Sequence, residues 1–223
     1  QLAGLGFAGS VLATAAGVFV FLAYGTTATV ARALGAGATD KVVSAGLDGT
    51  VLAAILGVLT AIGVGFGAET LCAALGADGE VLHHATIYLR ISALGLPAML
   101  IVMAIIGALR GVQDTRTPLF VSIAGFTLNA LLNVGLVYGL GWGIAGSAWG
   151  TVVAQYAMAS ALVAVWFVRL RASGATPRLH PAGVLAAAAN GVPLIIRTLS
   201  LRAILLLTTW VAAWAGSRRV LTV

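Results

Sequence analysis

The sequence predicts an all-α, polytopic bundle of transmembrane helices. Of its 223 residues, 61% are hydrophobic and only 8% are charged, whereas an ordinary soluble domain is about 25% charged. The mean hydropathy is +1.08. Within a bilayer only helices and closed barrels satisfy their backbone hydrogen bonds, and the apolar stretches here are much longer than the roughly ten-residue alternating strands of a barrel. We therefore expect helices.

Six stretches are apolar and long enough to cross a bilayer, which takes about 20 residues. They are Ser10–Ala31, Ser44–Gly67, Ala85–Leu109, Leu119–Tyr138, Ile144–Val168 and Val192–Trp214. Pro97, in the middle of the third stretch, removes a backbone donor and is expected to bend that helix. His180 and Pro181, with the alanines that follow, predict a short helix at the membrane surface before the last stretch.

The basic residues indicate how the chain is threaded through the membrane. The first, third and fifth connections contain seven of them, and the second and fourth contain none. The seven are Arg32, Lys41, Arg110, Arg116, Arg169, Arg171 and Arg178. Because basic residues accumulate in cytoplasmic loops, the odd-numbered connections are predicted to face the cytoplasm. This distribution accounts for the net charge of +6 without a nucleic-acid partner.

Catalytic and metal-binding patterns are absent from the sequence. It contains no nucleophile elbow, phosphate-binding loop or metal-ligand spacing, and Cys72 is the only cysteine. We expect all six acidic residues to lie in connections or at the ends of helices. They are Asp40, Asp48, Glu69, Asp78, Glu80 and Asp114. The sequence therefore predicts neither an enzyme nor a cofactor or metal site.

Polar side chains interrupt the fourth and fifth stretches. Asn129 and Asn133 are four residues apart and share one face of a helix, as do Thr151 and Gln155 on the next. A tight glycine-rich bend joins the two helices, so they are expected to be antiparallel neighbours. The four groups either form interhelical hydrogen bonds, each worth about 1 kcal/mol or less, or line a wet cavity that binds a cation or a polar substrate. Tyr88 belongs either to such a cavity or to the aromatic belt at the interface.

Several segments together resemble a known family. They are LAYGTTATVARALGAG (Leu22–Gly37), LRGVQDTRTPL (Leu109–Leu119), NALLNVGLVYGLGWGIAGSAWGTVVAQ (Asn129–Gln155) and GVPLIIRTLSLRA (Gly191–Ala203). In this order and spacing they are similar to the multidrug and toxic compound extrusion (MATE) transporters, in the DinF-like bacterial branch.

The resemblance implies twelve helices in two six-helix lobes, of which six are expected in this chain. Residues 1–168 would form the second to sixth helices of an incomplete N-terminal lobe. Residues 169–190 would be the cytoplasmic linker between the lobes, and residues 191–223 the truncated first helix of the C-terminal lobe. The chain is accordingly expected to be a fragment.

The resemblance also implies a site. Relatives build a cation site in the first lobe from an acidic residue on the first helix, an asparagine and an acidic residue four apart on the fifth, and a threonine on the sixth. Asn129, Asn133 and Thr151 match the last three positions, and Tyr88 matches a tyrosine near the same pocket. Asn133 is an amide where those relatives have a carboxylate, and an amide does not ionise. Because hard cations favour charged oxygen ligands, this favours H⁺ over Na⁺ as the coupling ion.

The predicted function is export of organic, often cationic compounds by cation antiport across the bacterial inner membrane. The predicted pocket consists of Asn129, Asn133, Thr151 and Tyr88, with Gln155 beside them. Its partners would be small organic substrates and the lipid bilayer, and the full-length protein would be a monomer. The alternatives are a lipid-linked saccharide flippase, which would be expected to show several basic residues in its cavity, and a non-functional truncated remnant.

Overall fold

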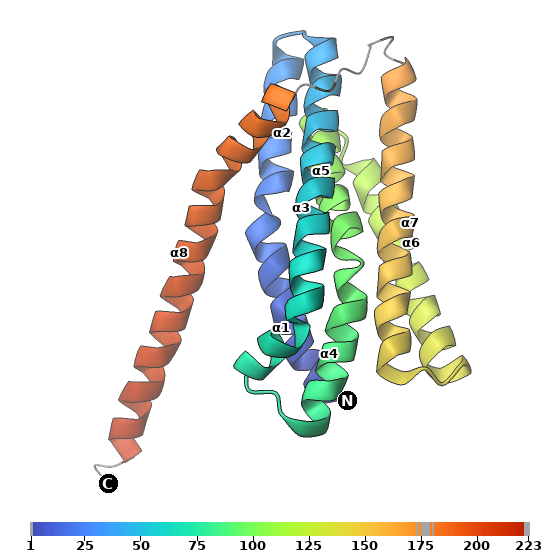
Figure 1. The fold of residues 1–223 in the computed structure, drawn as a ribbon. Helices are drawn as coiled ribbons and strands as arrows, with labels where there is room; N and C mark the ends of the chain where they lie inside the picture. Colours follow the sequence, from blue (N-terminus) through green and yellow to red (C-terminus); the bar gives the residue numbers. More distant parts are fainter. Residues whose placement is uncertain (1, 173, 175–178, 180, 221–223) are drawn as a thin grey trace.

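The all-α prediction is confirmed by the structure, a computed structural model that describes residues 2–172, 174, 179 and 181–220. Within these residues the chain contains helices and no strand (Figure 1). In order they are α1 (Leu2–Phe19), α2 (Phe21–Gly35), α3 (Thr39–Ala74), α4 (Gly79–Ala93), α5 (Leu96–Gly111), α6 (Arg116–Asn133), the π-helix η1 (Val134–Gly139), α7 (Gly143–Ala172) and α8 (Pro181–Val220).

Five of the six predicted membrane spans coincide with helices of sufficient length and apolar character. Four are continuous or nearly so: Gly4–Gly35, Thr39–Ala74, Arg116–Gly139 and Gly143–Arg169. The fifth is the pair α4 and α5, bent by 49° at a short break. The sixth predicted span, Val192–Trp214, lies within α8, and many of its side chains lie outside the described residues.

Proline stands in the first turn of a helix both in the third span and in α8. The third span is broken at Leu94 and Gly95, with Pro97 in the first turn of α5, so the predicted bend is confirmed. The predicted short surface helix is wrong, because α8 runs without interruption from Pro181 through the alanine run. Alanine is the strongest helix former, and proline in the first turn of a helix lacks only a donor that would be unpaired there anyway. His180 itself lies outside the described residues.

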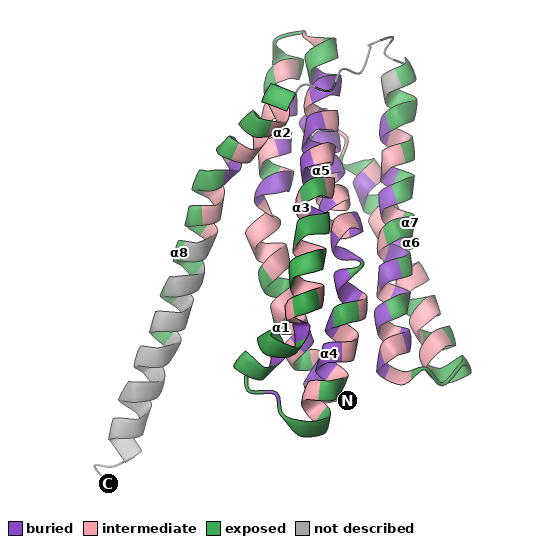
Figure 2. Ribbon diagram, viewed as in Figure 1, coloured by how far each residue is buried: buried purple, intermediate pink, exposed green. Residues whose placement is uncertain are grey.

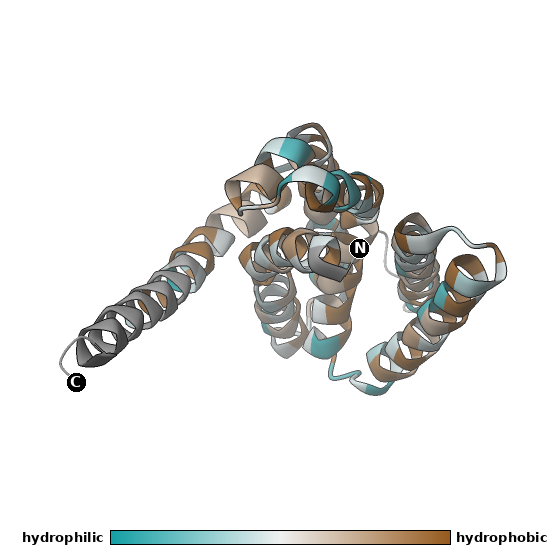
Figure 3. Ribbon diagram, turned by 90° about the horizontal axis from the view of Figure 1, so that it is seen from below, coloured by the Kyte–Doolittle hydropathy of each residue, from teal (hydrophilic) through white to brown (hydrophobic). Residues whose placement is uncertain are grey.

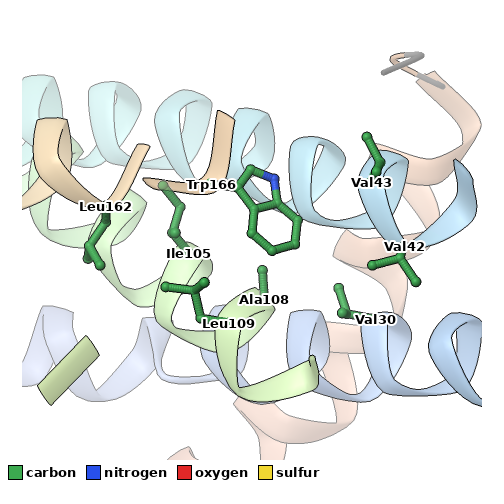
Figure 4. Packing of buried hydrophobic residues seen from close by; sticks show 8 residues of the cluster. All are labelled: Val30, Val42, Val43, Ile105, Ala108, Leu109, Leu162 and Trp166. Carbon is green, nitrogen blue, oxygen red and sulfur yellow. The ribbon is translucent and has the colours of Figure 1, made fainter. Parts of the chain in front are cut away.

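The helices form an elongated bundle with two peripheral parts. In Figure 2 the buried residues gather on the helices of the bundle, whereas α6 carries few. One core cluster lies between α2, α3, α5 and α7 (Figure 4); its members are Val30, Val42, Val43, Ile105, Ala108, Leu109, Leu162 and Trp166. Seen along the bundle, α6 and α7 form a pair on one side, and α8 projects away from the other helices (Figure 3).

The backbones of α2 and α5 meet at Gly107. A methyl group built on Gly107 would lie 2.4 Å from the carbonyl oxygen of Ala23. The Thr27 hydroxyl bridges the two helices there, since it lies 2.8 Å from the Ala23 carbonyl oxygen and 2.9 Å from the Gly107 carbonyl oxygen. Small residues allow this close approach, which is the main source of helix association in lipid.

Replacement of Gly107 by alanine should therefore destabilise the bundle, because the added methyl group meets backbone atoms that cannot rotate away. We expect a loss of about 1–3 kcal/mol in the free energy of unfolding, as is typical of overpacking. Gly63→Ala is the matched control, since nothing lies within 4 Å of a methyl group at that position of α3. Thermal unfolding of the detergent-solubilised protein measures the effect, and equal midpoints for the two variants would contradict it.

Asp114 ties the start of α6 to the end of α7. Its carboxylate accepts hydrogen bonds from the backbone N–H groups of Arg116 and Thr117, both at 3.0 Å, and forms an ion pair with the guanidinium group of Arg169. Burial alone would raise the pKa of the Asp114 carboxyl, but the hydrogen bonds from Thr117, the charge of Arg169 and the hydrogen bond from Arg116 together hold it below its usual value of 3.8.

Asp114→Asn should lower the stability of the protein in a pH-dependent way. A carboxylate whose pKa is lowered by folding stabilises the folded state above its unfolded pKa, and this contribution is lost as the pH falls through the folded pKa. We expect the wild type to unfold at a higher temperature than the variant near pH 7, with the difference shrinking below about pH 3.8. In the control Asp78→Asn, at the exposed start of α4, no such difference is expected. If the difference in unfolding temperature between the wild type and Asp114→Asn does not change with pH, the ion-pair explanation is refuted.

Candidate functional site

A chain of hydrogen bonds joins α6 to α7. The Asn133 side-chain amide donates to Asn129 Oδ1 at 2.7 Å, and the Asn129 amide donates to Thr151 Oγ1 at 3.2 Å. The Thr151 hydroxyl in turn donates to the Ser147 carbonyl oxygen at 3.0 Å. The structure thus brings together three of the five predicted site residues, and all three are half-buried.

The helix that carries the two asparagines changes its geometry directly after them. At Val134, α6 continues as the π-helix η1, in which backbone hydrogen bonds reach five residues back instead of four; such segments are frequent at functional sites. The bend beyond it contains Gly141 and Gly143, both at positive φ. The sequence showed the glycine-rich bend, but nothing in it indicated the π-helix.

Asn133 has an unused acceptor within this chain of hydrogen bonds. Its Oδ1 atom is buried and has no hydrogen-bond partner among the described residues. The atom lies over Gly150, where an added methyl group would be only 2.9 Å away. A buried acceptor without a partner costs about 1–3 kcal/mol, so a ligand that donates a hydrogen bond or carries positive charge would be stabilised here.

Gln155 faces a different feature of the fold, the break between α4 and α5. Its buried Oε1 lies over Gly95, where a methyl group would be 2.0 Å away. The neighbouring Tyr156 donates a hydrogen bond from its hydroxyl to the Leu94 carbonyl oxygen at 3.0 Å. The break therefore provides one of the contacts between α7 and the third span, and Gln155 lies one turn beyond the asparagine–threonine chain on the same face of α7.

Tyr88 lies apart from the asparagines. It packs in α4 against a cluster between α1, α3 and α4 that includes Ala8, Cys72 and Leu89. Of the predicted pocket, Asn129, Asn133 and Thr151 are thus directly connected, Gln155 is adjacent and Tyr88 belongs to another contact.

A groove opens beside the break, with a volume of about 680 Å³. Its walls come from α3, α4, α5 and α7 and are mainly apolar, with Phe66, Pro97 and Tyr156 among them. Arg90 lies at this groove and is 3.8 Å from Glu69, and both side chains are largely exposed. Among the described residues, no three His, Cys, Asp or Glu side chains gather into a group that could hold a metal ion.

One acidic residue does not lie where the sequence predicted. Asp48 was expected near a helix end, but α3 begins at Thr39, five residues earlier than the predicted stretch. Asp48 is therefore more than two turns inside the helix and is only 5% exposed. The spans thus contain a buried carboxyl group. The sequence did not predict this, because Asp48 is close to the start of the predicted apolar stretch.

Residues 1–134 of the chain match the MatE family, and this match covers more than half of the 223 residues. The chain belongs to the MatE family. The members of this family are the MATE transporters, which are not enzymes, and the predicted family is confirmed.

Two curated relatives match this chain over part of their own length. Protein DETOXIFICATION 44, chloroplastic, of Arabidopsis thaliana is 33% identical over 180 residues, which are 80% of this chain and 34% of the relative. DNA damage-inducible protein F of Escherichia coli (strain K12) is 33% identical over 140 residues, 63% of this chain and 30% of the relative. The chain spans about a third of the length of the curated relatives it matches.

Solved MATE structures share the fold. The inward-facing conformation of a multidrug resistance MATE family transporter of the MOP superfamily has a TM-score of 0.77 at 25% identity, with 89% of this chain and 46% of that chain covered. The crystal structure of MATE in the bent conformation has a TM-score of 0.83 at 24% identity, with 92% of this chain and 47% of that chain covered. The predicted MATE-type helix bundle is therefore confirmed.

The hydrogen bond between Asn129 and Thr151 should be measurable as a coupling energy. In a double-mutant cycle of Asn129→Ala and Thr151→Ala, we expect a favourable coupling of about 0.5–1.5 kcal/mol, the range found for interhelical hydrogen bonds in lipid. Thr127 serves as the control, because its hydroxyl bonds only within α6, to the Ile123 carbonyl oxygen. In the control cycle, Thr127→Ala takes the place of Thr151→Ala. The free energy of unfolding in mixed micelles is measured for both cycles, and equal coupling energies would argue against the interhelical hydrogen bond.

Proposed function

We propose that this chain belongs to a secondary transporter that exports organic, often cationic compounds in exchange for an inward-moving cation. Membership of the MatE family supports the class of transporter. The observation that carries the site is the chain of hydrogen bonds from Asn133 through Asn129 to Thr151, which places polar groups at half-buried positions within two apolar helices. Such groups at membrane depth mark pathways for ions or substrates.

Each group of this pocket has a distinct role. Asn129 is the hub, since its amide both accepts from Asn133 and donates to Thr151. The Oδ1 atom of Asn133, which has no hydrogen-bond partner among the described residues, receives a hydrogen-bond-donating or cationic group of the substrate. Gln155 extends the polar face toward the broken helix. Tyr88 is assigned to the site only by the family pattern, since it packs on the cluster between α1, α3 and α4.

The coupling ion is H⁺ rather than Na⁺. Asn129, Asn133 and Thr151 offer amide and hydroxyl oxygens and no negative charge. Na⁺ is a hard cation that is bound best by several charged or strongly polar oxygens, so an uncharged set of this kind holds it weakly. A proton needs only one carboxylate or a comparable base.

The domain organisation follows the family fold. Residues 1–168 belong to the N-terminal lobe, 169–190 link the lobes, and 191–223 begin the C-terminal lobe. In the structure α7 ends at Ala172 and α8 begins at Pro181, within the proposed linker, and α8 then diverges from the bundle, which supports a separation of the lobes after α7 (Figure 1). Transport then proceeds by rocking of one lobe against the other around a binding site near the middle of the membrane.

The transporter lies in a bacterial inner membrane as a monomer, with its odd-numbered connections on the cytoplasmic side. Arg32 and Lys41 at one connection, and Arg110 and Arg116 at another, support this orientation, because basic residues are retained on the cytoplasmic side during insertion.

The variants Asn129→Ala and Thr151→Ala test the pocket. Each is made in the full protein that the gene encodes and is expressed in a drug-sensitive bacterium. We expect each variant to lose resistance to ethidium while reaching the membrane in normal amounts, because each breaks the hydrogen-bond chain. Thr127→Ala removes an exposed hydroxyl from the same helix and should keep full resistance. Full resistance in both pocket variants, with active wild type, would refute the site. A wild type that transports no cationic dye would refute the function.

A further inference from the structure

The apolar groove beside the break between α4 and α5 plays no part in the proposed pocket. Its lining comes from α3 between residues 58 and 66, from Leu94 and Pro97 at the break, and from Tyr156 of α7. Nothing lies within 4 Å of a methyl group built on Gly65, which also lines the groove, so the space there is unfilled. The volume of about 680 Å³ lies within the range of about 300–1,000 Å³ that is typical of ligand sites. The groove is therefore large enough to hold a bound molecule.

The groove is open to the hydrocarbon of the bilayer. Val58, Ile62 and Phe66 are apolar and exposed on a helix that is long enough to cross a membrane. A bound water needs roughly two to four polar partners, and the hydroxyl of Tyr156 is already bonded to the Leu94 carbonyl oxygen. Because lipid chains are the solvent around such a surface, a lipid chain is the expected occupant of the groove.

The length of the groove matches one leaflet of the bilayer. Arg90 lies at the groove, and Glu69, which is 3.8 Å from Arg90, precedes the end of α3 at Ala74 by only five residues. Val58 lies about 17 Å from Glu69 along α3, at about 1.5 Å per residue. The hydrocarbon core of a bilayer is about 30 Å thick, so one leaflet contributes about half of this. A phospholipid whose headgroup lies at Arg90 would thus place one acyl chain along the groove.

Two opposite charges at this end of the groove select the headgroup. Among the described residues that line the groove, Arg90 alone is charged, and its partner Glu69 is also largely exposed. An exposed ion pair of this kind contributes little to stability, so both groups are accessible to a ligand. A guanidinium group matches the geometry of a phosphate, and a carboxylate accepts charge-assisted hydrogen bonds from an ammonium group. A headgroup with a phosphate beside a primary ammonium group is therefore complementary to the pair, whereas Glu69 repels a headgroup with net negative charge.

We propose that this groove binds one molecule of phosphatidylethanolamine. The phosphate of the lipid contacts Arg90, its ammonium group contacts Glu69, and one acyl chain lies along α3 as far as Pro97. The chain fills the space between α3 and α7 at the break, where the third span lacks the regular packing of a continuous helix. The lipid site does not depend on the proposed transport activity.

Native mass spectrometry of the full protein that the gene encodes tests the headgroup contacts. Delipidated protein receives phosphatidylethanolamine, phosphatidylcholine or phosphatidylglycerol with identical acyl chains. We expect the wild type to bind phosphatidylethanolamine about tenfold more tightly than phosphatidylcholine, whose trimethylated ammonium group cannot donate a hydrogen bond to Glu69. Glu69→Gln should lose most of this preference, whereas Arg90→Gln should bind both lipids more weakly and Arg90→Lys should lie between Arg90→Gln and the wild type. Glu80→Gln, at an exposed position in the first turn of α4, is the control and should behave as wild type.

A pair of glycine variants tests the position of the acyl chain. Gly65→Leu places a side chain in the groove, whereas Gly63→Leu adds the same side chain outside the lining, and a methyl group at either position meets nothing within 4 Å. Both variants are therefore expected to fold, and only Gly65→Leu should bind phosphatidylethanolamine several-fold more weakly than the wild type. Equal binding by the two leucine variants would overturn the inference. A wild type that retains no phosphatidylethanolamine, or that prefers phosphatidylcholine or phosphatidylglycerol, would overturn it as well.

Discussion

The fold depends on the close contact of helix backbones that glycine permits. At Gly107 the third span meets the carbonyl group of Ala23 in α2 with no room for a methyl group, and at Gly57 α3 meets Pro97 of the third span in the same way. Apolar side chains gain little free energy when they exchange contact with lipid for contact with another helix. Close backbone contacts and the hydrogen bonds beside them therefore hold the helices together. The bridging hydroxyl of Thr27 is part of the same contact.

This rigid centre explains how α7 presents its polar groups. The helix is anchored to the broken third span by the Tyr156 hydroxyl on the Leu94 carbonyl oxygen, and the pairing of α6 with α7 then places Asn129 beside Thr151. Because α6 buries little of its own surface, its position depends mainly on this pairing. The hydrogen-bond chain is therefore both a structural link and the polar lining of the proposed pocket.

Polar groups are buried at two separate places in the bundle. A chain of hydrogen bonds from Asn133 through Asn129 to Thr151 joins α6 to α7. Asp48 in α3 is only 5% exposed, and its neighbour Gly49 packs on Thr26 of α2. The spans therefore contain both an uncharged polar link and a buried carboxyl group.

Hydropathy and the helical period are local properties of the chain, so the sequence predicted the helical membrane fold, five of the spans, the bend at Pro97 and the face shared by Asn129 and Asn133. The sequence did not predict that the Gln155 side chain contacts the break between α4 and α5. That contact depends on which helix packs against α7 at the level of Gln155. Nor did the sequence reveal that Asp48 is buried, because burial depends on where α3 begins and on the helices that cover it. Such contacts join residues far apart in the chain, and no local sequence pattern predicts them.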